Sequence, residues 1–553
     1  MKAFTEPLLS LAGFEEMTKT AEKSSGLISV TGCIDAQKSQ MIYAFGGHRK
    51  NKLIVTFGEQ KAKELYDEYS FFDKEVVYYP SKDVLFYQSD IRGNLLTAER
   101  IRALKAIREQ ERVTLVTTFD ALMNTMAPIE KMWENVLTLE QGQLLDLKEI
   151  QAALIRMGYE KEYQVQTMGQ FSVRGGILDV FPLTEENPIR IELWGDEIDT
   201  IRYFDCESQK SIENIDRVSI YPAAELVLSD EEKAGGIEKL KAEAKRVSDK
   251  LRKQMKTEEA HRVTVMADEL TEEWGELSMY AGMDAFLSYF FDERVGLLDY
   301  FKPSDSLIFF DELTRCAEQG KLTETEFSES MKQRLAMGYI LPGQMNGLFT
   351  EKEIVAKLEK YSCIALGALD NKANGLHQLG SYGIHCQSVS PYNNSFELLI
   401  KDLKRYKKNG YRVILLSGSR TRAKRLSEDI TDQGITCFYT ENYDHELLEG
   451  QIMVCYGKVR RGFEYPILKF AVITESDIFG AQQKKKKRHR TYEGEKIQSF
   501  TDLSVGDYVV HENHGLGIYR GIEKLEVDKK VKDYIKIEYQ GGSNLYILAT
   551  QLD

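Results

Sequence analysis

A chain of 553 residues is too long for one hydrophobic core and predicts several domains. Its 42% hydrophobic and 29% charged residues are ordinary for a folded protein in water, and no run of 18 apolar residues predicts a membrane span. The net charge of −14 argues against broad, unaided binding to nucleic acid. Seven scattered cysteines without a C-x-x-C pair fit a reducing cytoplasm and predict no metal site, and acids within the apolar N-terminal stretch argue against a signal peptide.

The first motif follows a short apolar strand predicted over 27–30. Gly32, Lys38 and Ser39 have the spacing of a phosphate-binding P-loop, G-x-x-x-x-G-K-[ST], but Gln37 stands where the second Gly belongs. That Gly lets the backbone approach phosphate oxygens, so a side chain there crowds the cradle. We interpret 32–39 as a degenerate loop that no longer binds nucleotide well; a chance match is the alternative.

Strands and helices then alternate, as expected of a parallel α/β sheet. We predict strands at 52–56, 76–79 and 113–117 and helices at 60–69 and 95–110. Further on, a charged helix is predicted over 231–257, and an apolar strand ends in Asp311-Glu312, as a Walker B site presents its carboxylates. Many buried strands also end in acids. We predict that 1–125 and 223–385 form one discontinuous motor-like domain, with 126–222 inserted as a separate module.

The inserted module contains a strictly alternating strand over 189–194. Arg190, Glu192 and Trp194 share one face, and Arg174 lies on the polar face of an earlier strand. A Trp beside an Arg is a pairing enriched at the centres of protein interfaces. The alternative is that Trp194 is buried under another domain and that Arg190 pairs with Glu192.

The remaining chain predicts two further domains and a linker. Residues 386–480 predict a small α/β domain, with helices at 396–408 and 420–433 and strands at 412–416, 452–456 and 470–474. Its loop 417–420 is either an anion site or a capped helix start. The basic run 484–490 makes 481–499 a solvated linker, or a contact to the DNA backbone. Short strands broken by glycine turns predict a small β-barrel over 500–553.

Two of these stretches resemble one family. RGGILDVFP, IRIELWGDEIDTIRYFD and SQKS, between 169 and 211, resemble the second domain shared by the excision-repair protein UvrB and the bacterial transcription-repair coupling factor. In that family the domain docks onto UvrA, and the positions that match its contacts are Arg174, Arg190 and Trp194. The family often has Phe where Trp194 stands, which keeps an aromatic anchor.

The C-terminal stretches VGDYVVH and HGLGIY resemble the RNA-polymerase-interacting domain of the same family, shared with CarD-type regulators. That domain grips the polymerase β subunit, and its usual contact edge corresponds to the strand around 522–527. The resemblance therefore implies that Lys524, Leu525 and Glu526 contact RNA polymerase.

The resemblance covers essentially the whole chain and implies its fold and role. It implies an α/β multidomain protein: a degenerate P-loop motor fold with an inserted α+β UvrA-docking module, a small α/β domain and an SH3/Tudor-like barrel. Such a protein binds stalled RNA polymerase and recruits UvrA to DNA lesions in the cytoplasm, with no membrane partner. The family continues into an ATP-driven DNA translocase, which would hold ATP, Mg and most DNA contacts, so we expect no cofactor here. The alternative is a UvrB-like ATP-dependent repair enzyme, which leaves enzymatic activity open.

Overall fold

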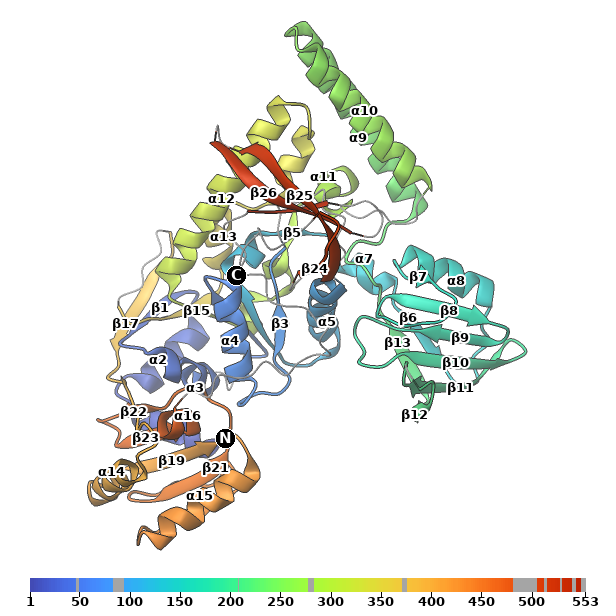
Figure 1. Cartoon of the computed structure of the whole chain (residues 1–553). Coiled ribbons are helices and arrows are strands. Elements are labelled where there is room, and N and C mark those ends of the chain that lie inside the picture. Colours follow the sequence, from blue (N-terminus) through green and yellow to red (C-terminus); the bar gives the residue numbers. More distant parts are fainter. Residues whose placement is uncertain are drawn as a thin grey trace.

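The computed structural model is a multidomain α/β protein built on several separate sheets (Figure 1). It describes residues 1–45, 49–82, 94–206, 208–276, 283–369, 375–480, 505–511, 515–527, 530–539 and 544–548. In the described part of the chain, no helix is long and apolar enough to cross a membrane.

The largest sheet has seven strands, all parallel, in the order β17-β1-β16-β15-β2-β4-β3. Its strands are β1 (Gly26–Thr31), β2 (Asn51–Thr56), β3 (Val77–Tyr79), β4 (Val113–Thr118), β15 (Ser306–Asp311), β16 (Ser362–Leu366) and β17 (Gln378–Gly383). Because β15 pairs with β2 on one side and β16 on the other, chain segments about 250 residues apart share one sheet. This confirms the predicted parallel α/β sheet, whereas the predicted domain boundaries remain predictions.

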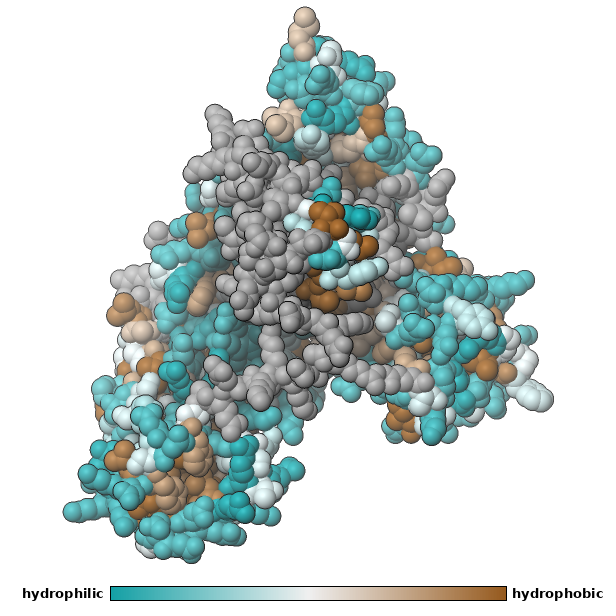
Figure 2. Space-filling model, viewed as in Figure 1, coloured by the Kyte–Doolittle hydropathy of each residue, from teal (hydrophilic) through white to brown (hydrophobic). Residues whose placement is uncertain are grey.

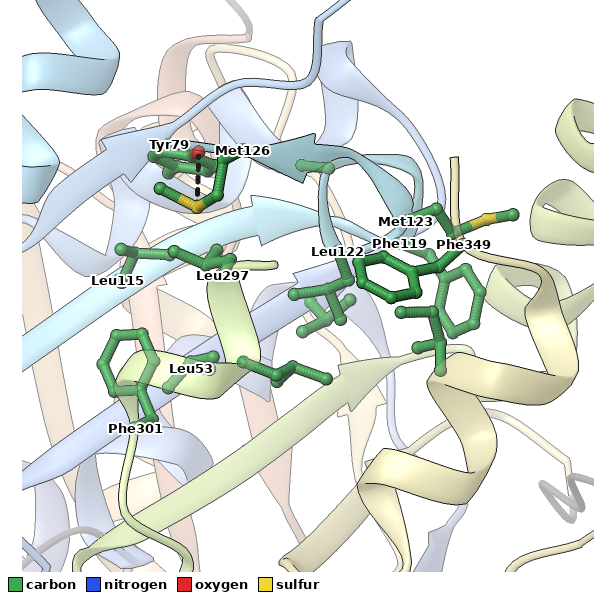
Figure 3. Packing of buried hydrophobic residues seen from close by; sticks show 14 of the residues in the cluster. Leu53, Tyr79, Leu115, Phe119, Leu122, Met123, Met126, Leu297, Phe301 and Phe349 are labelled. Carbon is green, nitrogen blue, oxygen red and sulfur yellow. Dashed lines mark hydrogen bonds between the residues drawn. The ribbon is translucent and has the colours of Figure 1, made fainter. Parts of the chain in front are cut away.

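Both faces of this sheet are covered along its inner strands, which explains why strands such as β15 and β16 are fully buried and largely apolar, whereas the edge strand β17 is not. Leu53 and Leu115 point into a core that also contains Phe119, Leu297 and Phe301 (Figure 3). Ile54 points to the opposite core, which contains residues of the first helices. The helices of residues 1–134 and 287–358 are α1 (Lys2–Thr5), α2 (Phe14–Lys23), α3 (Asp35–Phe45), α4 (Glu59–Tyr69), α5 (Asn94–Glu109), α6 (Phe119–Met123), α7 (Ile129–Glu134), α11 (Leu287–Phe290), α12 (Leu313–Ala336) and α13 (Glu351–Leu358), with the short strands β5 (Thr125–Met126) and β14 (Val295–Gly296).

A long helical hairpin extends from this body (Figure 1). It consists of α9 (Asp230–Lys253) and α10 (Thr257–Glu276). The charged helix predicted over 231–257 is confirmed as α9, but it ends earlier, at Lys253. Met255 then has a left-handed backbone (φ 65°) at the turn into α10, a helix that was not predicted. The two helices pack along a seam of buried side chains: Leu240, Ala244, Leu251, Ala260, Val263, Ala267 and Trp274.

The inserted module is built on a six-stranded sheet in the order β12-β11-β10-β9-β8-β7. The strands are β7 (Glu160–Lys161), β8 (Gln170–Arg174), β9 (Ile177–Val180), β10 (Ile189–Trp194), β11 (Glu197–Phe204) and β12 (Ser211–Ile215). Helix α8 (Leu147–Arg156) and the pair β6 (Leu137–Glu140) and β13 (Arg217–Ile220) accompany it. The buried residues Ile189 and Ile191 of β10 join the module's own hydrophobic core, as the alternation predicted.

A third sheet follows in the order β18-β22-β23-β19-β21-β20. Its strands are β18 (Gln387–Ser388), β19 (Arg412–Ser417), β20 (Phe438–Tyr439), β21 (Ile452–Tyr456), β22 (Phe463–Tyr465) and β23 (Phe470–Thr474), with helices α14 (Phe396–Lys408), α15 (Arg420–Asp432) and α16 (Glu475–Phe479). Its side chains Ile414, Met453 and Phe470 share a hydrophobic core with Ile28 of β1 and Met41 of α3. The predicted basic linker, including 484–490, lies outside the described residues.

The C-terminal strands form an antiparallel sheet in chain order. They are β24 (Tyr508–His511), β25 (Gly515–Val527), β26 (Lys530–Glu538) and β27 (Asn544–Leu548). These pairings give an antiparallel meander, and closure into a small barrel stays a prediction.

Candidate functional site

Trp194 is the most exposed apolar anchor of the inserted module. It is the last residue of β10, opposite Glu197 of β11, and 85% of its surface is exposed. Gly195, at φ 66°, turns the chain directly after it. The structure therefore contradicts the alternative in which Trp194 is buried under another domain.

Trp194 lines a groove of ≈ 650 Å³. The groove's other walls carry Glu197, Asp199 and Asp216, together with Glu140, whose Oε1 lies 3.1 Å from Arg217 Nε. Carboxylates thus outnumber cations around the exposed indole. An aromatic ring beside carboxylates offers a binding partner both cation–π and ionic contacts.

Arg190 is largely buried, unlike Trp194, although both were predicted to lie on one exposed face. Its Nε and Nη2 donate to the two oxygens of Asp179 (2.7 and 2.9 Å), and Nη2 also donates to Gln209 Oε1 (2.8 Å). Its guanidinium lies 4.3 Å from the ring centre of Phe204, and only 12% of the side chain is exposed. Because Asp179 is itself buried, Arg190 first serves to neutralise a buried carboxylate.

The expected exposure of Arg190 was therefore wrong, and so was its alternative pairing with Glu192. Glu192 accepts hydrogen bonds from Arg202 instead. Arg174 shares Asp179 with Arg190 (Nη2–Oδ2 2.8 Å) and is 36% exposed, so it can still donate outward. Asp179 is the organising residue that the sequence pattern missed. The sequence signal that could have identified Asp179 is its position in the stretch RGGILDVFP, on the strand that pairs with β10.

The degenerate loop lies at the carboxyl end of β1, where α3 begins at Asp35. Gln37, Lys38 and Ser39 are therefore buried helical residues, and the expectation of a loop reaching Ser39 was wrong. The N–H groups of Gly32 and Cys33 donate to the carbonyls of Ala368 (3.2 Å) and Gly367 (3.0 Å). Gly32 has φ 75°, and a Cβ there would lie 2.1 Å from the Ile384 carbonyl oxygen, so neighbouring chain closes over this turn.

Lys38 contacts three carboxylates. Its Nζ lies 2.5 Å from Asp311 Oδ1, 3.0 Å from Glu312 Oε1 and 3.1 Å from Asp35 Oδ1. Burial opposes the charged form, yet Asp311 raises the pKa of Lys38 above its usual range. Burial also acts to raise the pKa of Asp35, but hydrogen bonds from Lys61 and Lys38 hold it at about 2. The structure thus brings together the lysine and the acidic strand end that the sequence singled out separately, and they neutralise each other.

Tyr465 of β22 covers the first turn of α3. Its hydroxyl donates to Gln37 Oε1 at 2.8 Å and lies 3.3 Å from Gln40 Oε1, and all of these side chains are buried. Gln37 Nε2 and Ser39 Oγ are buried and have no hydrogen-bond partner among the described residues. Side chains from the third sheet therefore occupy the space beside Gln37, where a P-loop would need open backbone.

The loop 417–420 is the capped start of α15, and the carboxylate of Glu475 binds to it. Ser419 Oγ accepts from Arg422 N–H at the start of α15. Glu475 accepts from Gly418 N–H (2.6 Å) and Ser417 Oγ (3.0 Å), and it also pairs with Arg422. A side-chain carboxylate thus takes the position that an anionic ligand would occupy.

Lys524, Leu525 and Glu526 lie in β25, opposite Asp533, Lys532 and Val531 of β26. Among the described strands, the stretch of β25 from Gly521 to Val527 pairs only with β26, because β24 pairs with residues 515–518. Among the strands that the structure describes, this stretch is therefore a sheet edge, with no strand paired to its other side. Its predicted polymerase contacts remain predictions.

Two domain families match the chain. The family described as UvrB interaction domain matches residues 137–226, which include the whole Trp194 surface. The family described as CarD-like/TRCF RID domain matches residues 503–553, which include the β25 edge. The chain therefore contains a UvrB interaction domain followed by a CarD-like/TRCF RID domain, as the two resemblances predicted.

The similarity extends beyond these two domains to almost the whole chain. The chain is 30% identical to the transcription-repair-coupling factor of Bacillus subtilis (strain 168) over 503 residues, which cover 90% of this chain and 42% of that protein. For the factors of Staphylococcus haemolyticus (strain JCSC1435) and Staphylococcus aureus (strain MRSA252) the identities are 29% and 28%, covering 95% and 98% of this chain and 44% and 46% of those proteins. The chain is thus a relative of transcription-repair-coupling factors along almost its entire length, and it spans less than half of theirs.

Proposed function

We propose that this chain is the partner-binding part of a transcription-repair-coupling factor, which binds stalled RNA polymerase and recruits UvrA to DNA lesions. The observation that carries the proposal is Trp194, a large aromatic side chain exposed at the end of β10 in a UvrB interaction domain. An exposed aromatic side chain that becomes buried on docking is a common energetic centre of a protein interface.

The expected contribution of Trp194 to the binding free energy follows from its exposed surface. An aromatic side chain buries roughly 150–250 Å² on docking, and at about 25 cal/mol per Å² this gives several kcal/mol before the costs of association. We therefore expect Trp194→Ala to cost about 2 kcal/mol, which is a roughly 30-fold weaker affinity for UvrA. Isothermal titration of UvrA into each purified chain measures this.

Tyr163 provides a matched control in the same module, because 84% of its surface is exposed as well. Tyr163→Ala should leave the UvrA affinity within about twofold, and neither variant should change the thermal midpoint by more than about 1 °C, since surface truncations cost little stability. If Trp194→Ala bound UvrA as tightly as the parent chain, Trp194 would not belong to the interface.

The polymerase contact is proposed at the exposed edge of β25. Edge strands bind extended partners through their free backbone groups, and side chains such as Lys524, Leu525 and Glu526 add specificity. We infer that residues 500–553 form the small barrel that holds the polymerase β subunit. Capture of RNA polymerase should be lost when the chain ends at Glu495 and weakened at least tenfold by Leu525→Arg, which adds a charge that the contact would have to desolvate. Undiminished capture by the shortened chain would place the polymerase contact elsewhere.

We propose that the seven-stranded sheet is a motor-derived scaffold without nucleotide chemistry of its own. The mutual neutralisation of Lys38 and Asp311, and the contact between Gln37 and Tyr465, support this proposal. ATP, Mg and DNA translocation would then belong to the part of the related factors that this chain does not cover. The competing proposal, a UvrB-like ATP-dependent enzyme, requires ATP binding at Lys38.

A further inference from the structure

The α9–α10 hairpin ends in a tip, which we define as residues 250–256. At a rise of about 1.5 Å per residue, α9 alone is roughly 36 Å long, and the hairpin reaches well beyond the central sheet (Figure 1). The turn after α12 supports one side: Arg262 donates to the Met337 carbonyl, and Gly338 packs against the Glu259 carbonyl. Beyond this support every tip residue except Leu251 is exposed.

The tip is strongly cationic in an acidic protein. Between 245 and 256 the sequence has six Lys or Arg residues and one Asp, against a net charge of −14 for the chain. Among the described residues, the exposed side chains of Lys250, Arg252, Lys253 and Lys256 form no ion pair. The C-terminal dipole of α9 favours cations in its last turn, but this effect fades within one turn and does not account for Lys256, which lies beyond the helix.

An apolar side chain stands in the middle of these cations. Met255 is 88% exposed, the highest exposure of any large apolar side chain in the described chain, and its left-handed backbone (φ 65°) forms the turn itself. Proteins that bind DNA through phosphate contacts often place such an apolar side chain, Met among them, against the groove or between base steps.

We propose that the hairpin tip binds the phosphate backbone of duplex DNA, with Met255 against the groove. Four exposed cations at one hairpin tip, without an ion pair to any described residue, match a repeating polyanion, since such a ligand offers a separate phosphate to each. A pocket of ≈ 540 Å³ lies lower on the hairpin, where Lys239, Glu243 and Arg246 line it, and it includes no residue of the tip. This binding does not depend on the proposed contacts to UvrA or RNA polymerase, because it uses neither Trp194 nor β25.

The test measures binding of a fluorescent 30-base-pair duplex to the full chain by anisotropy at several salt concentrations. All proteins compared have glutamine throughout 484–490, so that this second cationic stretch does not contribute. The tip variant combines Lys250→Gln, Arg252→Gln, Lys253→Gln and Lys256→Gln. The charge-matched control combines Lys23→Gln, Lys148→Gln, Lys352→Gln and Lys401→Gln, which are exposed lysines on four other helices.

We expect the tip variant to bind at least tenfold more weakly and its salt slope, log K against log [salt], to be shallower by about four, one for each lost phosphate contact. The control should change affinity less than threefold. Met255→Glu, which leaves both helices intact, should weaken binding in the same direction. A photo-crosslinking residue at position 255 should label the duplex.

Equal affinities of the tip variant and the control would overturn the proposal. So would crosslinks from position 255 that reach only UvrA or RNA polymerase when the duplex is also present, because the tip would then be a protein contact. Loss of UvrA binding by Trp194→Ala is measured separately, so failure of the proposed function and failure of this inference give different results.

Discussion

Replacing Lys38 by Met should destabilise the seven-stranded sheet, whereas in a working nucleotide site the same change would mainly abolish ATP binding. The reason is Asp311, which is 2% exposed and whose only other side-chain hydrogen bond among the described residues comes from Thr56 Oγ1 at 3.4 Å. Asp35 and Glu312 are more exposed and can turn toward water. The expected loss of stability therefore comes from one carboxylate, Asp311, which stays buried without its cationic partner.

Breaking a buried ion pair by removing one partner typically costs about 3–5 kcal/mol, because the remaining charge is buried and unpaired. For a domain of this size, about 4 kcal/mol corresponds to a decrease of roughly 10 °C in the thermal midpoint. Circular dichroism gives the midpoint, and hydrogen exchange of β15 shows whether the loss is local to the strand that ends in Asp311.

Two companion variants distinguish destabilisation by a buried unpaired charge from the loss of a nucleotide site. Asp311→Asn added to Lys38→Met should recover at least half of the lost stability, since the buried charge is removed. Lys61→Met, which removes the more exposed ion pair with Asp35 (2.8 Å), should cost less than about 1 kcal/mol. An unchanged midpoint for Lys38→Met, together with saturable micromolar ATP binding that this variant loses, would refute the reasoning and support the enzyme interpretation.

Two further predictions follow from buried charges. Arg190→Ala should weaken UvrA binding and also lower the thermal stability of the inserted module by about 3 kcal/mol, because Asp179 keeps only Arg174; intact stability in a thermal melt would show that Arg190 is a purely interfacial residue. Burial raises the pKa of Glu68 to about 7, above about 4.5 in the unfolded chain, so the folded state binds the extra proton and its stability should fall as pH rises from about 5 to 8. Glu68→Gln should flatten that slope in urea unfolding and add about 3 kcal/mol at pH 8, and parallel pH profiles of the two proteins would contradict this assignment.

Local periodicity was sufficient for many elements of this protein. The alternation at 189–194 predicted β10 residue for residue, and the amphipathic pattern at 396–408 predicted α14 equally well. Both signals depend only on neighbours within a few residues, which the sequence contains directly. The long motif around Trp194 likewise indicated the UvrB interaction domain that the family match confirms. Chain reversal at Met255 was missed, because a left-handed non-glycine turn has no strong local signal.

Which charged groups meet was decided only by the tertiary structure. Alternation assigned Arg190 and Trp194 to one face and treated them alike, but the register of β9 on β10 places Asp179 beside Arg190 and leaves Trp194 free. Lys38 of α3 and Asp311 of β15 are 273 residues apart, and their side chains come to 2.5 Å because β1, which leads into α3, and β15 both pair with β16. Ion-pair energies depend on distance and on exclusion of water, and neither quantity is defined until the sheets have assembled. The sequence by itself determined the elements and the kind of protein; only the folded structure separates an exposed anchor from a buried charge.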